Sequence, residues 1–218
     1  MTVPSGLSVA VVGRGASTVA ALAGRLTEPE EGVILLDGVP LPELGRDELR
    51  QAVGYAFARP ALVGATVHDV IALGPRAVGT DVVRAAARSA RADGFVRRLP
   101  GGYGTPLDKA PMSGGEAQRL GLARAFAHPG RVLIFDDATS SLDTVTELQV
   151  SQAITGELGD RTRLIVSARA ATAARADLVA WLHEGRVRAL AGHDTLWRDP
   201  AYRAEFAPAV QDRAGSVR

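Results

Sequence analysis

Short apolar runs alternate with segments of helical spacing, and this alternation constrains the fold more than any other feature of the chain. The runs expected to form strands are Leu7–Val12, Val33–Leu36, Ala52–Phe57, Val132–Phe135 and Leu164–Ser167, with two more strands around a turn at Glu184-Gly185 within Asp177–Ala189. The helices are expected over Ser17–Leu26, Asp81–Arg98 with Asp81 as its cap, Ser113–Phe126, and after Asp143. Alternating strands and helices indicate an α/β fold with a mainly parallel sheet covered on both faces.

Composition excludes several classes of function. The formal net charge of +1 gives no electrostatic footprint for nucleic acid, so we expect no nucleic-acid partner. There are no cysteines, which excludes a disulfide scaffold and thiol catalysis. No apolar run approaches the roughly 20 residues of a membrane-spanning helix. We therefore expect a single soluble, cytoplasmic domain over residues 1–218 whose last residues (VQDRAGSVR) form a loose tail.

Three motifs, in a fixed order, carry the strongest indication of function. They are MSGGEAQRLGLARAF (Met112–Phe126), RVLIFDDATSSLD (Arg131–Asp143) and LIVSARAAT (Leu164–Thr172). Together they resemble the signature, the Walker B strand with its D-loop, and the switch strand of the ABC ATPase family. Two further stretches resemble exporter-type members of that family, namely GATVHDVIALG (Gly64–Gly74) and AGHDTLWRDPAYRAEF (Ala191–Phe206).

The resemblance implies a P-loop NTPase fold with an inserted helical subdomain. We expect the core in residues 1–63 and 127–218, and the helical subdomain in residues 64–126, ending in the signature helix. Family members carry an antiparallel segment upstream of the phosphate loop, with an aromatic residue that stacks on adenine. Here the first aromatic is Tyr55, and only six residues precede Leu7, so this segment is expected to be truncated.

The sequence around Ser113 has two interpretations. Ser113 and Glu116 match a capping box, in which each side chain satisfies a backbone amide at the start of a helix. The intervening glycines also leave amides bare at a helix N-terminus, where the positive end of the dipole attracts phosphate. The resemblance favours binding of ATP held by another subunit, through Ser113, Gly114, Gly115 and Glu116. The D-loop residues it implies are Ser141, Leu142 and Asp143.

Two adjacent carboxylates follow the apolar run VLIF, where a parallel sheet places ligands. Asp136 matches the Walker B aspartate that holds Mg²⁺ through water. Asp137 stands where the family usually has a catalytic glutamate that positions the attacking water. Because aspartate is one methylene shorter, its carboxylate is expected to stand back by about 1 Å or more, a displacement that can cost about 10²-fold in rate.

The phosphate loop departs most from the family pattern. A Walker A motif, G-x-x-x-x-G-K-[ST], wraps phosphates with backbone amides and reaches the outer ones with a lysine. Three residues of this pattern are missing before Ser17, Ala16 takes the lysine position, and the single lysine of the chain is Lys109. A tight strand-to-helix turn therefore competes with nucleotide binding as the interpretation of Gly13, Arg14, Gly15, Ala16, Ser17 and Thr18. Ser17 and Asp136 remain the expected Mg²⁺ ligands.

Two other expected contacts to ATP are missing. The Q-loop glutamine position, after the strand Ala52–Phe57, is Ala58, and the switch histidine position is Ala168. ABC domains pair head to tail, so that each ATP lies between the Walker motifs of one subunit and the signature of the other.

The resemblance implies an ATP-binding domain of an ABC transporter that works at the cytoplasmic face of a membrane, with ATP and Mg²⁺ as cofactors. Its partners would be another ABC ATPase domain and a membrane-spanning domain. We expect its own site to be catalytically impaired, with its signature completing a partner's site. The alternatives are an active transport ATPase with an atypical phosphate loop, and a fragment without function.

Overall fold

A computed structural model describes residues 1–207 of the chain, and the expected tail Val210–Arg218 lies outside them. The main sheet has six strands in the order β4-β5-β6-β1-β7-β8. They are β1 (Ser8–Val12), β4 (Val53–Phe57), β5 (Val132–Asp136), β6 (Thr162–Val166), β7 (Leu178–His183) and β8 (Arg186–Ala191). Neighbouring strands run parallel except for β7 and β8, which form an antiparallel pair. The mainly parallel α/β fold predicted from the sequence is confirmed.

Ten α-helices occupy the described residues. They are α1 (Ala16–Ala23), α2 (Arg46–Ala52), α3 (Val67–Ala72), α4 (Thr80–Ser89), α5 (Asp93–Val96), α6 (Gly114–Ala127), α7 (Thr144–Gln152), α8 (Ala170–Ala173), α9 (His193–Leu196) and α10 (Pro200–Ala204). Short 3₁₀ turns lie at Leu41–Glu43, Gly102–Gly104 and Leu107–Lys109, and α7 continues as a π-helical turn, Ala153–Glu157. None of the helices in residues 1–207 is long and apolar enough to cross a membrane.

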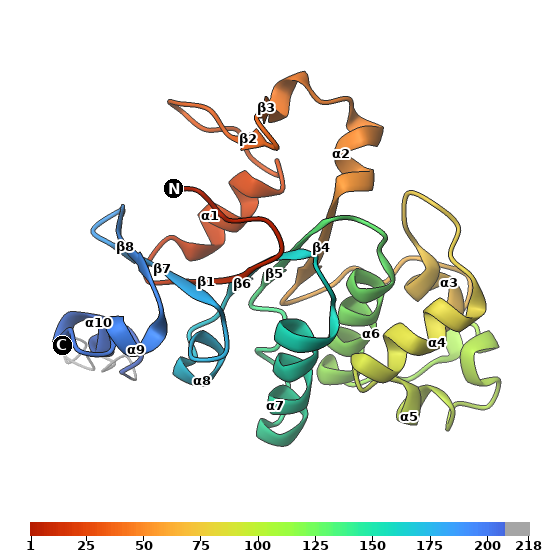
Figure 1. Ribbon diagram of the computed structural model, residues 1–218. Coiled ribbons are helices and arrows are strands. Elements are labelled where there is room, and N and C mark those ends of the chain that lie inside the picture. The colour runs from red at the N-terminus through yellow and green to blue at the C-terminus, as the bar shows by residue number, and fades with distance from the viewer. Residues whose placement is uncertain (208–218) are drawn as a thin grey trace, which may run out of the picture.

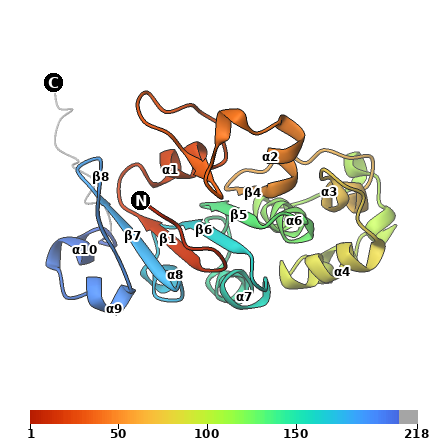
Figure 2. The same ribbon diagram turned by 45° about the horizontal axis from the view of Figure 1, so that its top comes forward.

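Both faces of the sheet are covered by helices, as Figures 1 and 2 show. On one face, Val9 and Val11 of β1 pack with Ala20 of α1. On the other face, the alternate residues Ala10 and Val12 pack against the segments of α8 to α10, while β5 and β6 pack against α6 and α7. Every residue of β1 is buried, which explains the apolar run that follows Ser8.

Helices α3 to α6 lie between β4 and β5 in the chain and pack largely on one another. They share a buried cluster with the sheet residues Leu133 and Phe135. Two of these helices start with a capping box, formed by Thr66 and Asp69 at α3 and by Ser113 and Glu116 at α6. Both boxes satisfy amides that a helix start would otherwise leave without an acceptor.

The helix predicted over Asp81–Arg98 is wrong in two respects. The cap position is Gly79, and Asp81 lies in the first turn of α4 without a capping hydrogen bond. The helix also breaks, because Arg91 adopts the left-handed conformation with φ of 56°. The amide of Ala92 then bonds to the carbonyl of Ala87 at 2.7 Å, which closes α4 before α5 begins.

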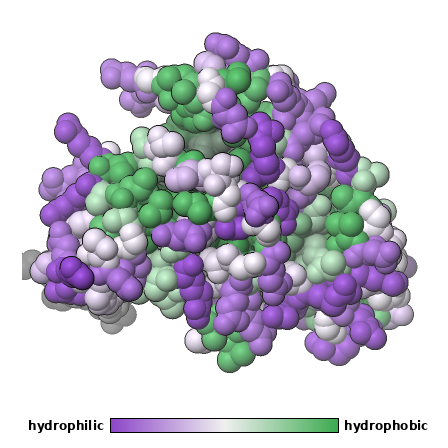
Figure 3. Space-filling model, viewed as in Figure 1, coloured by the Kyte–Doolittle hydropathy of each residue, from purple (hydrophilic) through white to green (hydrophobic). Residues whose placement is uncertain are grey.

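The strand predicted over Val33–Leu36 is shorter than expected. Only Leu35–Leu36 (β2) is extended, paired with Val39–Pro40 (β3) across a turn whose two residues, Asp37 and Gly38, both have positive φ. This hairpin carries exposed apolar side chains, and Figure 3 shows hydrophobic residues gathered over β2 and β3 at the top of the molecule.

Candidate functional site

The loop between β1 and α1 forms a tight turn. Gly13 has φ of 104° and Gly15 has φ of 93°, both in the region that favours glycine. A Cβ atom on Gly13 would lie only 2.1 Å from the carbonyl oxygen of Leu182 in β7. The amide of Ala16 bonds to the carbonyl of Gly13 at 3.2 Å, so it is directed into the turn. Ser17 and Thr18, in the first turn of α1, keep amides that the helix itself does not use.

Two hydroxyls converge on the carboxylate of Asp136 at the end of β5. Ser17 donates to Oδ1 at 2.7 Å, and Tyr55 of β4 donates to Oδ2 at 3.1 Å. The Tyr55 ring stacks on Phe57 and contacts Gly24 at the end of α1, where an added Cβ would lie 2.9 Å from the ring. Burial, followed by the charge of Asp136, raises the pKa of Tyr55, so the hydroxyl stays protonated and acts as the donor.

Asp137 follows Asp136 in a strained backbone conformation, with φ of 47°. Its amide donates to the carbonyl of Val166 in β6 at 3.2 Å, and its carbonyl accepts from the amide of Ser140 at 3.0 Å. These bonds hold the turn that carries the D-loop. Burial first, and the neighbouring charge of Asp136 second, raise the pKa of the Asp137 carboxyl.

The signature and the D-loop lie against each other. At the start of α6, the Ser113 hydroxyl accepts from the Glu116 amide at 3.3 Å, and Glu116 accepts from the Ser113 amide at 2.9 Å. The capping-box interpretation of these two residues is therefore confirmed. An added Cβ on Gly115 would lie 3.1 Å from the carbonyl oxygen of Ser141, so the two loops approach to backbone contact.

The D-loop continues directly into α7. Asp143 is the N-cap of that helix and accepts from the amides of Val145 and Thr146. Leu142 is buried in the core, whereas Ser141 and Asp143 are exposed. The D-loop therefore presents polar groups outward from an anchored backbone.

The two alanine positions follow β4 and β6, the strands on either side of β5. Ala58 follows β4 and is half-buried, and its carbonyl accepts from the Gln118 side chain at 2.9 Å. Ala168 follows β6 by two residues and is exposed. The next residue, Arg169, pairs with the buried Glu147 of α7. Its partly exposed guanidinium is therefore engaged in an ion pair with a buried carboxylate.

The two halves of the expected site are separate within one chain. Among residues 1–207, no hydrogen bond or ion pair joins residues 13–18 to residues 113–116. Ser17, Asp136 and Asp137 gather at the end of β5, while the signature and D-loop gather at the start of α6.

The chemistry of Ser17 and Asp136 fits Mg²⁺. Both offer hard oxygen atoms, and Mg²⁺ in nucleotide sites is usually held by one or two protein oxygens together with phosphates and waters. No cluster of three or more His, Cys, Asp or Glu side chains suited to a metal is found in the described part of the chain. The protein alone therefore offers no complete cage, and phosphate oxygens would have to complete the shell.

Residues 1–140 match the ABC transporter family. The chain belongs to the ABC transporter family. Among its relatives, the ABC transporter ATP-binding protein RamA of Streptomyces coelicolor is 56% identical over 207 residues, which cover 94% of this chain and 32% of that protein. The mycobactin import ATP-binding/permease protein IrtB of Mycolicibacterium smegmatis is 40% identical over 187 residues, which cover 84% of this chain and 32% of that protein.

A solved structure of an ABC exporter has the same fold. A bacterial Atm1-family ABC exporter with ATP bound superposes with a TM-score of 0.84 at 36% identity, over 93% of this chain and 37% of that one. The chain spans about a third of the length of these relatives. It is an ABC ATP-binding domain with exporter-type homologues.

Two residues at the site were not predicted from the sequence. Tyr55 was noted only as the first aromatic residue, although alternation along β4 places it on the face toward α1. Gln118 was counted within the signature motif without a role, yet it is fully buried and bonds to two other segments, the end of β4 and the turn after β5. A polar side chain close to the apolar residues Ala117, Leu120 and Leu122 of one helix was the available signal.

Proposed function

We propose that this chain is the nucleotide-binding domain of an ABC transporter that donates its signature to an ATP site on a partner domain, while its own site hydrolyses ATP weakly or not at all. In this domain, residues 1–63 and 127–218 would form the core, and residues 64–126 would form the helical subdomain. It places the domain at the cytoplasmic face of the membrane through a transmembrane partner.

The observation that carries this proposal is the contrast between the two loops. The turn at residues 13–16 directs the Ala16 amide to Gly13, although a Walker A loop would offer this amide to phosphate. No lysine stands in the loop. In contrast, α6 begins with an ordered capping box and glycines at an exposed end.

Several missing groups support weak hydrolysis at the chain's own site. Removing one preorganised group typically costs about 10²–10³ in rate, and such losses do not add independently. Here the loop lysine, the Q-loop glutamine and the switch histidine are replaced by Ala16, Ala58 and Ala168. Asp137 retains a carboxylate at the position of the water-orienting residue, with one methylene fewer than glutamate.

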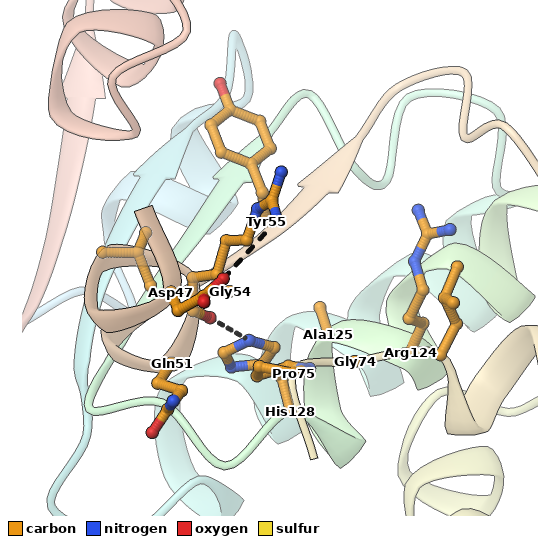
Figure 4. A pocket seen from close by; sticks show the side chains of 12 residues that line it. Asp47, Gln51, Gly54, Tyr55, Gly74, Pro75, Arg124, Ala125 and His128 are labelled. Carbon is orange, nitrogen blue, oxygen red and sulfur yellow. Dashed lines mark hydrogen bonds and ion pairs between the residues drawn. The ribbon is translucent and has the colours of Figure 1, made fainter. Parts of the chain in front are cut away.

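A groove beside β4 supports a membrane-spanning partner. It has a volume of about 650 Å³ and is lined by residues of α2, β4, the end of α3 and the end of α6. Figure 4 shows these side chains, with His128 below α2 and bonded to the carbonyl of Arg50 at 2.9 Å. The groove adjoins β4, which is followed by Ala58, the position that the family uses to sense its membrane partner. We propose that a segment of that partner docks there.

The direction of transport is also a proposal, since relatives include both an exporter and a protein named for import.

Calorimetry with Mg²⁺ and ATP tests the impaired half of the proposal. We expect the isolated chain to bind ATP more weakly than about 100 μM, a free energy of about −5.5 kcal/mol. Tighter binding would contradict it, because the short loop would then cradle the triphosphate after all. A matched titration of Asp136→Asn reports whether any binding seen depends on the expected Mg²⁺ position.

The second candidate is an active ATPase, and one observation favours it. Ser17 and Asp136 lie 2.7 Å apart, so the protein oxygens expected to hold Mg²⁺ are still in place. ATP turnover by the isolated chain that disappears in Asp136→Asn would establish this alternative.

A fragment without function, the third possibility, would show neither turnover nor any effect on a partner.

A further inference from the structure

Gln118 lies on the second turn of α6 and is fully buried. A buried carboxamide without hydrogen-bond partners is destabilising, so its hydrogen bonds decide whether it is tolerated. Here both ends of the side chain are used. The amide nitrogen donates to the carbonyl of Ala58 at 2.9 Å, and the oxygen accepts from the amide of Ser141 at 2.9 Å.

The same nitrogen has two further acceptors near the D-loop. It lies 3.3 Å from the carbonyl oxygen of Asp137 and 3.2 Å from the Ser140 hydroxyl. The bonded segments are far apart in sequence, since Ala58 is 60 residues before Gln118 and Ser141 is 23 residues after it. One side chain therefore joins α6, the end of β4 and the turn after β5.

Close packing holds these segments near Gln118. An added Cβ on Gly121, one turn further along α6, would lie 2.6 Å from Pro60 in the loop that follows Ala58. Gly115 makes the similar approach to Ser141 on the other side. Figures 1 and 2 show α6 running beside β4 and β5. The backbone is thus close enough on both sides for one carboxamide to span the gap.

The residue at position 58 makes this link important. Alanine has no polar side chain, so Ala58 itself is linked to α6 through its backbone carbonyl, beside the bond from Arg124 to the carbonyl of Ala61. We propose that Gln118 is a positioning residue that fixes Asp137 and the D-loop relative to the signature helix and to the end of β4. A shift of α6 is then passed through it to Asp137 and to the D-loop together.

Two substitutions separate the two ends of the side chain. Gln118→Glu keeps an oxygen that can accept from the Ser141 amide, but it loses the donors to Ala58 and Asp137. Gln118→Leu has a similar size and loses both ends. Gln152→Glu makes the same chemical change at an exposed position of α7 and serves as the control.

Amide NMR on the unliganded chain reads each end independently of any ATP or partner. In Gln118→Leu, hydrogen exchange at the Ser141 amide should accelerate about tenfold, while amides of β5 and β6 keep their protection. In Gln118→Glu, the Ser141 amide should stay protected. The resonances of Arg59 and Ala138, whose peptide groups contain the two released carbonyls, should shift in both variants but not in the control.

The outcomes decide the proposal even if one variant is unstable. Unchanged Ser141 exchange in Gln118→Leu, or unchanged Arg59 and Ala138 resonances in Gln118→Glu, would overturn it. If Gln118→Leu fails to fold, the Gln118→Glu spectra alone decide between the two results. Because these measurements need neither nucleotide nor partner, their failure is distinct from a failure of the proposed function.

Discussion

At the scale of single residues, the turn after β5 concentrates the unusual features of the molecule. Asp137 combines a left-handed backbone with a carboxyl that is half-buried beside Asp136. Among the hydrogen bonds and ion pairs of the described residues, no cationic side chain pairs with the Asp137 carboxyl. Ionising such a carboxyl costs free energy. This cost is tolerated at sites where the carboxylate faces a bound cation or polarises a water molecule.

Asp137→Asn should raise the stability of the unliganded chain at neutral pH. The folded-state pKa of Asp137 lies above its ordinary value of 3.8, so its contribution to stability is fully present below that value and is lost as the pH rises through the folded pKa. Asparagine carries no charge and tolerates positive φ, so it avoids this loss. Urea midpoints should therefore favour the variant at pH 7, and the gap should narrow toward pH 4.

The matched control is Asp143→Asn at the cap of α7, which should behave in the opposite way. Hydrogen bonds from Thr146 and from backbone amides lower the pKa of Asp143. Its carboxylate therefore stabilises the fold above its ordinary pKa, and that contribution disappears as the pH falls. A pH-independent difference between Asp137→Asn and the wild type would show that burial of the Asp137 charge has no part in the effect.

At the scale of elements, the junction of β1 and α1 depends on Gly13. The loop there has no room for a side chain, because the backbone of β7 fills the space beside it. The junction is therefore tied to the sheet, and the position of Ser17 relative to Asp136 follows from it.

Gly13→Ala should destabilise the chain by roughly 3 kcal/mol, from strain at positive φ and from collision with Leu182. Gly185→Ala in the β7–β8 turn is the matched control, since φ there is 75° but nothing lies within 4 Å of the new methyl group. It should cost only about 1 kcal/mol. Equal losses in chemical denaturation would show that the contact with β7 is irrelevant.

The sequence predicted regular elements well where apolar periodicity was long and turn residues were typical. Apart from the strand predicted over Val33–Leu36, the strands and the signature helix lie close to their predicted bounds, and the capping box was readable from Ser113 and Glu116. The break at Arg91 was not readable, because its left-handed conformation belongs to a residue other than glycine. A tertiary contact accompanies it, since Arg119 donates to the Arg91 carbonyl at 2.8 Å and lies over the Phe95 ring.

The candidate site was predictable in its motif residues and not in its supporting contacts. Spacing alone placed Asp136 and Asp137 at a strand end, where the structure has them. The contacts of Tyr55 and Gln118 depend on which elements pack together. The residues next to them in the sequence do not reveal this packing. The hydrogen bond from Tyr55 to Asp136 joins residues 81 positions apart.

At the scale of the whole molecule, two regions of one chain have different proposed tasks. We propose that residues 13–18 and the end of β5 form a reduced phosphate site, and that the start of α6 with the D-loop forms a surface for another domain. A defined partner can be built from this chain itself. It would carry a full-length phosphate loop with lysine, together with Ala58→Gln, Asp137→Glu and Ala168→His.

The most direct measurement mixes the natural chain with this repaired copy after Ser113→Arg has disabled the signature of the copy. The repaired copy with Ser113 intact is the positive control and should hydrolyse ATP alone. The Ser113→Arg copy and the natural chain should each be nearly inactive alone. The account predicts that their mixture hydrolyses ATP at least about tenfold faster than the sum of the two. An active positive control beside an inactive mixture would contradict it.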